Sequence, residues 1–169
     1  NNDGWPDFYI VRGAWLGEKG RVPNLLLRNR GDGTFADVSA ASGIAATAWP
    51  CLAAAWCDYD LDGDLDVYIG NERLRRGSFA PSELWRNEGD GTFREVAAQA
   101  GVTNGRFARG VAWGDYDNDG DFDIYVSNFG DYNRLYRNRG DGTFEDVAPS
   151  LGVAEQTADH SAYHRTQRP

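Results

Sequence analysis

The sequence is poor in sulfur and in histidine. Its 169 residues include no methionine, two cysteines and two histidines. Cys51 and Cys57 flank a predicted strand that spans about 20 Å, whereas a disulfide needs Cα atoms within about 7 Å. We therefore expect two small buried residues without a disulfide. His160 and His164 have no further histidine or carboxylate pair beside them, so we expect a surface tail and no zinc site.

Positive charge and long apolar runs are also scarce. Lysine and arginine number 17 against 26 aspartates and glutamates, which gives a formal net charge of −9. Binding to nucleic acid requires a basic surface, so this class of partner is excluded. No apolar run approaches the roughly 20 residues of a membrane-spanning helix, and no signal-peptide pattern is present. We expect no membrane span.

The acidic residues are concentrated in two runs of nine residues, 58–66 and 115–123. Aspartate occupies every odd position of each run, and glycine occupies the sixth. Ca²⁺ takes about six to eight oxygen ligands, and glycine permits the positive φ that wrapping an ion requires. One such run could equally be an acidic turn, but two equivalent copies indicate Ca²⁺ as the cofactor. The predicted calcium ligands are Asp58, Asp60, Asp62, Asp64 and Asp66, and Asp115, Asp117, Asp119, Asp121 and Asp123.

These runs differ from EF-hand loops. An EF-hand carries a bidentate glutamate at its twelfth position and a helix on each side. The twelfth positions here are Ile69 and Val126, and the flanking residues are β-branched and aromatic, which is typical of strands. We therefore predict calcium loops that each join two strands. Asp66 or Asp123 would take the role of the glutamate, and the seventh residue would contribute its backbone carbonyl.

The chain begins inside a third, partial copy of the loop. Its first seven residues align with the end of the complete runs and place Asn1, Asp3, Trp5 and Asp7 at ligand positions. We expect a partial calcium site there. Because the chain starts inside a metal loop and without methionine, we interpret it as a piece of a longer protein. Weak calcium loops suit the millimolar calcium outside cells, so we expect an extracellular or cell-surface location.

A second motif repeats in step with the acidic runs. The pattern Arg-Asn-x-Gly-Asp-Gly-Thr-Phe occurs at 28–35, 86–93 and 137–144. Glycines around an aspartate, placed between two apolar runs, predict a hairpin turn because they supply positive φ. All-β repeats of this length are typical of propeller blades.

Each full repeat divides into four predicted strands. The fold class is therefore all-β, with β-propeller blades built as four-stranded antiparallel sheets. About two and three-quarter blades are present, which leaves an incomplete ring. The predicted strands are 8–11, 25–29 and 34–38, then 52–57, 67–71, 84–87 and 92–96, then 109–114, 124–128, 135–138 and 143–147. The predicted units are a partial blade at 1–44, full blades at 45–102 and 103–153, and a polar tail at 154–169.

Two tryptophans occupy equivalent positions in the repeats. Trp56 and Trp113 each precede the first aspartate of a complete loop by two residues. We expect both indoles to be buried.

The connections between the second and third strands differ in length and in charge. Variable loops on one face of a repeated scaffold often carry binding residues. A solvated loop with an incidental aromatic residue is an equal alternative here. The candidate contact residues are Trp15, Arg73, Arg75, Arg76 and Phe79.

Together the acidic runs and the hairpin motif resemble the FG-GAP/VCBS repeat proteins. The resemblance is strongest to propellers that accompany an ASPIC/UnbV domain and to those of the cartilage acidic protein type. It covers residues 1 to about 153 and rests on Gly114 to Asp123 and on the three hairpins. It implies calcium between the first two strands of a blade, as in integrin α-subunits, and an exported protein used in adhesion, recognition or assembly. The first loop departs from the pattern at Trp5-Pro6, and no ASPIC/UnbV domain follows.

The sequence shows no catalytic constellation of nucleophile, acid and base. We therefore favour a non-enzymatic extracellular module that binds calcium and acts in adhesion, recognition or structural assembly, including filaments. Its partners would be further blades of a longer parent chain or copies of itself, and a glycan or protein ligand. A segment of a calcium-dependent polysaccharide lyase is one alternative, and a carbohydrate-binding propeller lectin is another.

Overall fold

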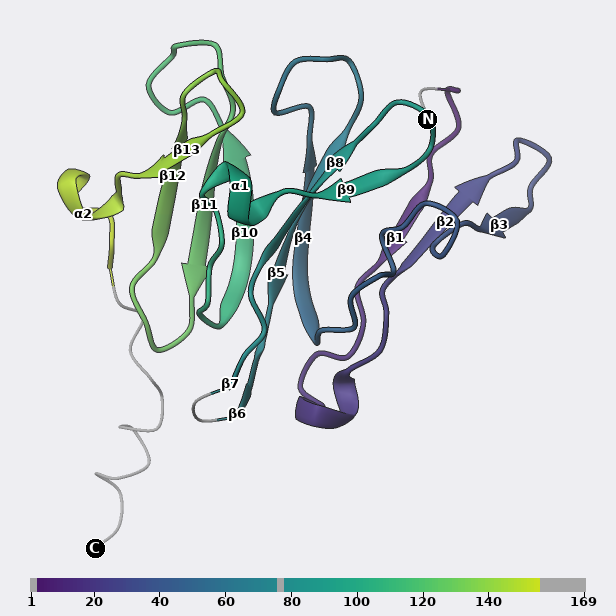
Figure 1. The fold of residues 1–169 in the computed structure, drawn as a ribbon, viewed down its shortest axis with the longest axis horizontal. Coiled ribbons are helices and arrows are strands. Elements are labelled where there is room, and N and C mark those ends of the chain that lie inside the picture. The colour runs from purple at the N-terminus through teal and green to yellow at the C-terminus, as the bar shows by residue number, and fades with distance from the viewer. Residues whose placement is uncertain (1–2, 76–77, 156–169) are drawn as a thin grey trace, which may run out of the picture.

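A computed structural model describes residues 3–75 and 78–155 of the chain. These residues form an all-β structure in which three antiparallel sheets of three, four and four strands stand next to one another (Figure 1). A separate two-stranded hairpin extends from the second sheet. Among the described residues, no helix is long and apolar enough to cross a membrane.

The strands of each sheet follow one another in sequence order. The first sheet contains β1 (Phe8–Ile10), β2 (Leu25–Asn29) and β3 (Phe35–Asp37). The second contains β4 (Cys51–Cys57), β5 (Asp66–Asn71), β8 (Glu83–Asn87) and β9 (Phe93–Glu95). The third contains β10 (Ala108–Gly114), β11 (Asp123–Asn128), β12 (Arg134–Asn138) and β13 (Phe144–Asp146).

Every predicted strand is confirmed to within a residue or two at its ends. The sequence did not predict the hairpin of β6 (Arg73–Arg75) and β7 (Ser78–Phe79), nor three short helices. The helices are η1 (Gly17–Gly20), α1 (Ala97–Ala100) and α2 (Ala148–Leu151). Both α-helices end at a glycine with positive φ, Gly101 at 80° and Gly152 at 70°, which is a common way to stop a helix. His160 and His164 lie outside the described residues.

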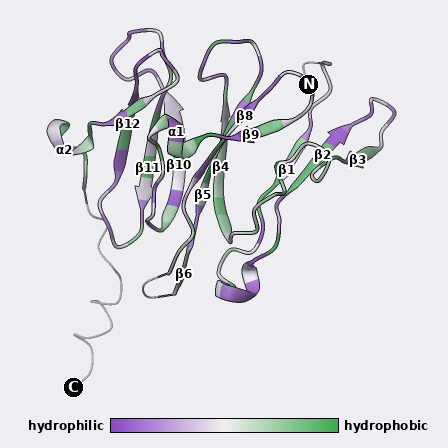
Figure 2. Cartoon of the chain, viewed as in Figure 1, coloured by the Kyte–Doolittle hydropathy of each residue, from purple (hydrophilic) through white to green (hydrophobic). Residues whose placement is uncertain are grey.

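The hydrophobic core fills the two spaces between neighbouring sheets. Strand β5 contributes to both because successive side chains of a strand point to opposite faces. Val67 and Ile69 pack toward the first sheet, with Leu26. Tyr68 packs toward the third sheet, with Ile124. A strand covered on both faces needs a continuous apolar run, which β4 shows as largely green ribbon in Figure 2. In β5 the run is limited to Val67, Tyr68 and Ile69, with Asp66 and Asn71 at its ends.

The prediction that Trp56 and Trp113 are buried is wrong, because both side chains keep partial access to solvent. Their equivalence holds, because Trp56 pairs with Val67 and Trp113 with Ile124 at matching places in the register. Both residues are only partly buried. The Trp113 indole stacks on Tyr59, with ring centroids 6.2 Å apart, and its N–H donates to the Ala55 carbonyl at 3.0 Å. The large ring therefore bridges two sheets at their margin, where part of it stays accessible to solvent.

The two cysteines are buried and form no disulfide, as predicted. They lie at opposite ends of β4. Burial raises the pKa of the Cys51 thiol to about 12 and that of Cys57 to about 12 as well. Both are neutral packing residues at physiological pH.

Candidate metal centre

The two complete acidic runs form loops at the same edge of neighbouring sheets, the upper edge in Figure 1. One loop joins β4 to β5 and the other joins β10 to β11. In the first loop, carboxylate oxygens of Asp58, Asp60 and Asp62 lie within 4.8 Å of one another. In the second loop, those of Asp115, Asp117 and Asp123 do the same.

The first aspartate of each loop accepts hydrogen bonds from backbone N–H groups later in the same loop. In the first loop, the N–H groups of Asp62 and Gly63 donate to the two carboxylate oxygens of Asp58, each at 3.0 Å. The equivalent bonds to Asp115 measure 3.2 and 3.1 Å. A second turn follows, because the N–H of Asp64 donates to Asp62 Oδ1 at 2.9 Å. The loops therefore have the same internal framework, and the wrapped conformation is built into the chain.

This wrapping places two residues of each loop at positive φ. The glycines at the sixth position, Gly63 and Gly120, both have φ of 96°. The fourth position holds Leu61 at 58° in one loop and Asn118 at 60° in the other. Asparagine tolerates this region much better than leucine. The first loop thus carries local strain that the second avoids.

The last aspartate of each loop is buried and anchored from two directions. Asp66 accepts from the backbone N–H of Asn87 at 2.8 Å and from that of Tyr59 at 3.2 Å. Asp66 is 0% exposed. Burial, followed by the charges of Asp60 and Asp62, raises the pKa of Asp66 to about 7, against the opposing effect of the two hydrogen bonds. Burial likewise raises the pKa of Asp123. A nearby cation would favour the ionised form of such a carboxylate.

At the seventh position of each loop, the aspartate side chain lies against the hairpin turn of its own sheet. The carboxylates of Asp64 and Asp121 lie against Gly89 and Gly140 in the hairpin turns, where an added Cβ would fall 3.0 and 2.8 Å from a carboxylate oxygen. Neither side chain joins the oxygen clusters defined above. This arrangement leaves the backbone carbonyl as the group that the seventh residue could offer to an ion, and its role as a ligand stays a prediction.

The hairpin motif holds the acidic loop in place, a connection that the sequence analysis missed. The side-chain amide of Asn138 donates to the carbonyl of Phe122 at 3.2 Å and accepts from the N–H of Gly140 at 3.1 Å. It also donates to the Tyr59 carbonyl of the neighbouring sheet at 2.9 Å. Asn87 repeats the contacts within its own sheet. The two sequence motifs are therefore one structural unit.

The partial first loop keeps the anchor but not the acidic cluster. Asp7 Oδ1 accepts from the N–H of Asn29 at 2.8 Å, as Asp66 and Asp123 do from their asparagines. Trp5 replaces the seventh aspartate, and its ring crowds Gly31. Within residues 3–75 and 78–155, no metal-compatible cluster includes Asp3 or Asp7. Asn1 lies outside the described residues.

The β6–β7 hairpin and the segment around η1, which hold the described candidate contact residues, lie at the opposite, lower edge of Figure 1. Trp15 precedes η1 and is 63% exposed. Arg73, Arg75 and Phe79 belong to the β6–β7 hairpin, which lies beside η1, and their side chains are outside the described part of the structure. Arg76 lies outside the described residues altogether.

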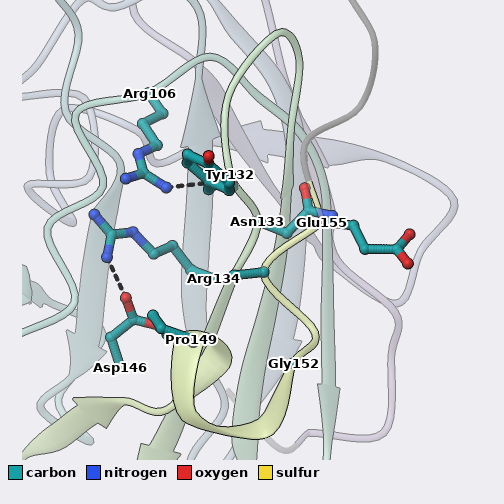
Figure 3. Close-up of a pocket in the computed structure, with 9 residues that line it drawn as sticks. Arg106, Tyr132, Asn133, Arg134, Asp146, Pro149, Gly152 and Glu155 are labelled. Atoms are coloured by element: carbon teal, nitrogen blue, oxygen red, sulfur yellow. Dashed lines mark hydrogen bonds and ion pairs between the residues drawn. The ribbon is translucent and has the colours of Figure 1, made fainter.

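A cavity of about 430 Å³ lies beside β12 and α2 (Figure 3). Its arginines are largely engaged with the protein itself. Arg134 pairs with the carboxylate of Asp146, and Arg106 donates to the carbonyl of Tyr132 at 2.5 Å and lies 3.3 Å from Asp131. These pairs account for both positive charges, so the cavity gives no separate indication of a ligand.

Comparison with known proteins agrees with this geometry. The model of the FG-GAP-like repeat matches residues 1–69 and 74–126. The chain belongs to the FG-GAP-like repeat family. The matched stretches contain both acidic loops and two of the three hairpin motifs, so the family assignment rests on the same residues as the site.

Curated relatives of this FG-GAP repeat chain include cartilage acidic protein 1 from several vertebrates. The Homo sapiens protein is 30% identical over 138 residues, which is 75% of this chain and 20% of that protein. The Xenopus tropicalis protein is 29% identical over 122 residues, 68% of this chain and 18% of that protein. The chain thus spans about a fifth of the length of the curated relatives it matches.

Proposed function

We propose that this FG-GAP repeat chain is a calcium-binding segment of a β-propeller in an extracellular protein, and that it serves adhesion, recognition or structural assembly. One observation carries the proposal. A cluster of three aspartates, on the same hydrogen-bonded framework, recurs in two neighbouring sheets, with positions one and three shared and the third member at position five in one loop and position nine in the other. The similarity to proteins named cartilage acidic protein supports an extracellular setting.

The donor set favours Ca²⁺ over other ions. Each cluster offers carboxylate oxygens and contains no histidine or cysteine, and hard oxygen donors in flexible number suit Ca²⁺. Asp58, Asp60 and Asp62 would hold the ion in the first loop, and Asp115, Asp117 and Asp123 in the second. The buried Asp66, the carbonyl of Asp64 and the remaining predicted ligands complete the proposed sets. Bound Ca²⁺ would neutralise like charges that otherwise repel one another.

The packing between sheets supports a propeller with further blades. Tyr59, the second residue of its loop, is 3% exposed and packs on Trp113 and Phe144 of the next sheet. Tyr116 holds the same loop position in the third sheet and is 40% exposed. A further blade that offers a tryptophan and a phenylalanine would cover Tyr116 in the same way. We propose that such a blade comes from the same polypeptide or from a second copy.

Two variants of one loop test the calcium site. Asp60→Asn removes a charged ligand, whereas Asp64→Asn makes the same charge change at a side chain that points to the hairpin. We expect the first to weaken calcium binding at that loop at least about tenfold, and the second to change it by less than about threefold. Calcium titration by calorimetry measures both. Equal losses for the two variants, or fewer than one Ca²⁺ per unmodified chain by elemental analysis, would overturn the proposal.

A further inference from the structure

Four side chains converge at the edge opposite the calcium loops, and we call them the aromatic–arginine cluster: Trp15, Phe107, Arg109 and Phe129. The guanidinium carbon of Arg109 lies 4.2 Å from the ring centroid of Phe129, 4.8 Å from that of Trp15 and 5.6 Å from that of Phe107. The Trp15 and Phe107 rings are 6.1 Å apart. Trp15 lies in the connection between β1 and β2 of the first sheet, and the other three residues lie in or next to β10 and β11 of the third sheet. The cluster therefore exists only in the folded chain.

Trp15 is held in an unfavourable backbone conformation and remains exposed. Its φ is 68°, a backbone conformation that bulky residues rarely adopt, and the residue is 63% exposed. Its N–H donates to Glu72 Oε2 at 2.8 Å, which fixes the strained residue to the second sheet. Burial of the indole does not explain this strain. Strain that presents an exposed aromatic ring is the kind found at ligand sites.

Two charged residues lie next to Trp15. Arg109 is exposed and makes no hydrogen bond to any of the described residues, so its N–H groups are available above the aromatic faces. Glu72 is 3% exposed, and its Oε1 is buried without a hydrogen-bond partner in the described part of the chain. Burial raises the pKa of Glu72, and the hydrogen bond from Trp15 N–H and then the charge of Arg109 oppose this rise.

We propose that the aromatic–arginine cluster is a binding site for an acidic carbohydrate, a sugar that carries a carboxylate or a sulfate. The C–H face of a sugar ring stacks on an exposed indole, and a guanidinium pairs with a planar or tetrahedral anion through several N–H groups. Glu72 holds the backbone of Trp15 in place by accepting from its N–H. A simple anion gains nothing from Trp15 and is repelled by Glu72, whereas a neutral sugar leaves Arg109 unused. This site is separate from the calcium loops and does not depend on the proposed calcium function.

The test uses the full chain in saturating calcium and three tetrasaccharides of one β-linked backbone. These are neutral cellotetraose, its oxidised form with carboxylates, and its sulfated form. We expect one or both anionic forms to bind at least about tenfold more tightly than cellotetraose in calorimetry, and their order tells whether carboxylate or sulfate is preferred. Arg109→Gln should abolish this preference, and Trp15→Ala should weaken binding of every form.

A matched control lies outside the cluster. The guanidinium of Arg21 lies 4.4 Å from the centroid of the Trp49 ring, the same type of pair as Arg109 over Trp15. Arg21→Gln should leave glycan binding unchanged. Arg109→Lys keeps the charge and should still lose most of the preference, because a lysine lacks the planar fork. The proposal is overturned if no anionic form binds, if Arg109→Gln and Arg109→Lys bind like the unmodified chain, or if Arg21→Gln weakens binding equally.

Discussion

Replacing Asn138 with alanine should destabilise the protein more than the same change at the equivalent asparagines. Asn138 is 2% exposed, and its side chain makes three hydrogen bonds, to Phe122, Gly140 and Tyr59. Alanine removes all three and leaves backbone groups without partners. At roughly 1 kcal/mol for each bond lost in a buried site, the free energy of unfolding should fall by about 3 kcal/mol. The bond from the backbone N–H at this position to Asp123 is retained.

The equivalent asparagines of the other two repeats, Asn87 and Asn29, serve as controls. Asn87 makes two of the three side-chain bonds and none to a neighbouring sheet, so Asn87→Ala should cost about 2 kcal/mol. Asn29 makes the equivalent two bonds, to Pro6 and Gly31, but it is only partly buried. Water can replace the lost partners there, so Asn29→Ala should cost about 1 kcal/mol or less. The difference between Asn138 and Asn87 isolates the bond that joins two sheets.

Equilibrium unfolding in urea, in saturating calcium, measures these three free energies. The slope of the unfolding free energy against urea should stay the same, because the surface exposed on unfolding does not change. If Asn138→Ala costs no more than Asn29→Ala, the bond between sheets and the burial of this asparagine do not contribute to stability, and the reasoning is refuted.

Three further predictions follow from the loops and from the exposed edge of the third sheet. Leu61→Asn should stabilise the protein by about 1 kcal/mol in thermal or urea unfolding, because leucine is strained at positive φ and asparagine is not. Asn118→Leu should destabilise it by a similar amount, and variants as stable as the unmodified chain would contradict this reasoning. Because the pKa of Asp66 is raised to about 7, its contribution to the stability of the calcium-free form is present at acid pH and is lost as pH rises through about 7. At the proposed site calcium would bind the ionised form, so its measured affinity should fall as pH drops below about 7. An affinity independent of pH would disprove this coupling. In sedimentation experiments with calcium, the isolated chain should self-associate or unfold readily because Tyr116 is uncovered; a stable, cooperatively folded monomer would be evidence against this.

The strands and acidic loops could be predicted because their causes are local and repeated. Alternation of side chains, turn glycines and odd-numbered aspartates are visible in the sequence, and three copies in register define the ends of each strand. The depth of burial was not visible in this way. The repeats show that Trp56 and Trp113 are equivalent, but they do not show that each indole lies at the margin between two sheets, partly accessible to solvent.

Contacts between sheets could not be predicted, because they depend on how the sheets pack. The bond from Asn138 to Tyr59 joins residues 79 positions apart. The aromatic–arginine cluster shows the same limit. The sequence singles out Trp15 in its connecting loop, but it places Arg109 in a first strand and Glu72 at the start of the loop after a second strand. Their proximity requires three sheets in their final arrangement, which no single repeat encodes.

The acidic loop and the hairpin motif have different roles at the site. In the partial first loop, the bond from Asn29 to Asp7 persists although tryptophan stands at the seventh position. The anchor therefore does not depend on a full acidic cluster, and it belongs to the sheet. In the complete loops, the same anchor holds Asp66 and Asp123, which begin β5 and β11. Ordering of the hairpin thus positions a buried carboxylate before any ion arrives. At the proposed calcium sites, the ion would stabilise a loop whose last ligand is already fixed by strand pairing, so metal affinity and the integrity of each sheet would be coupled.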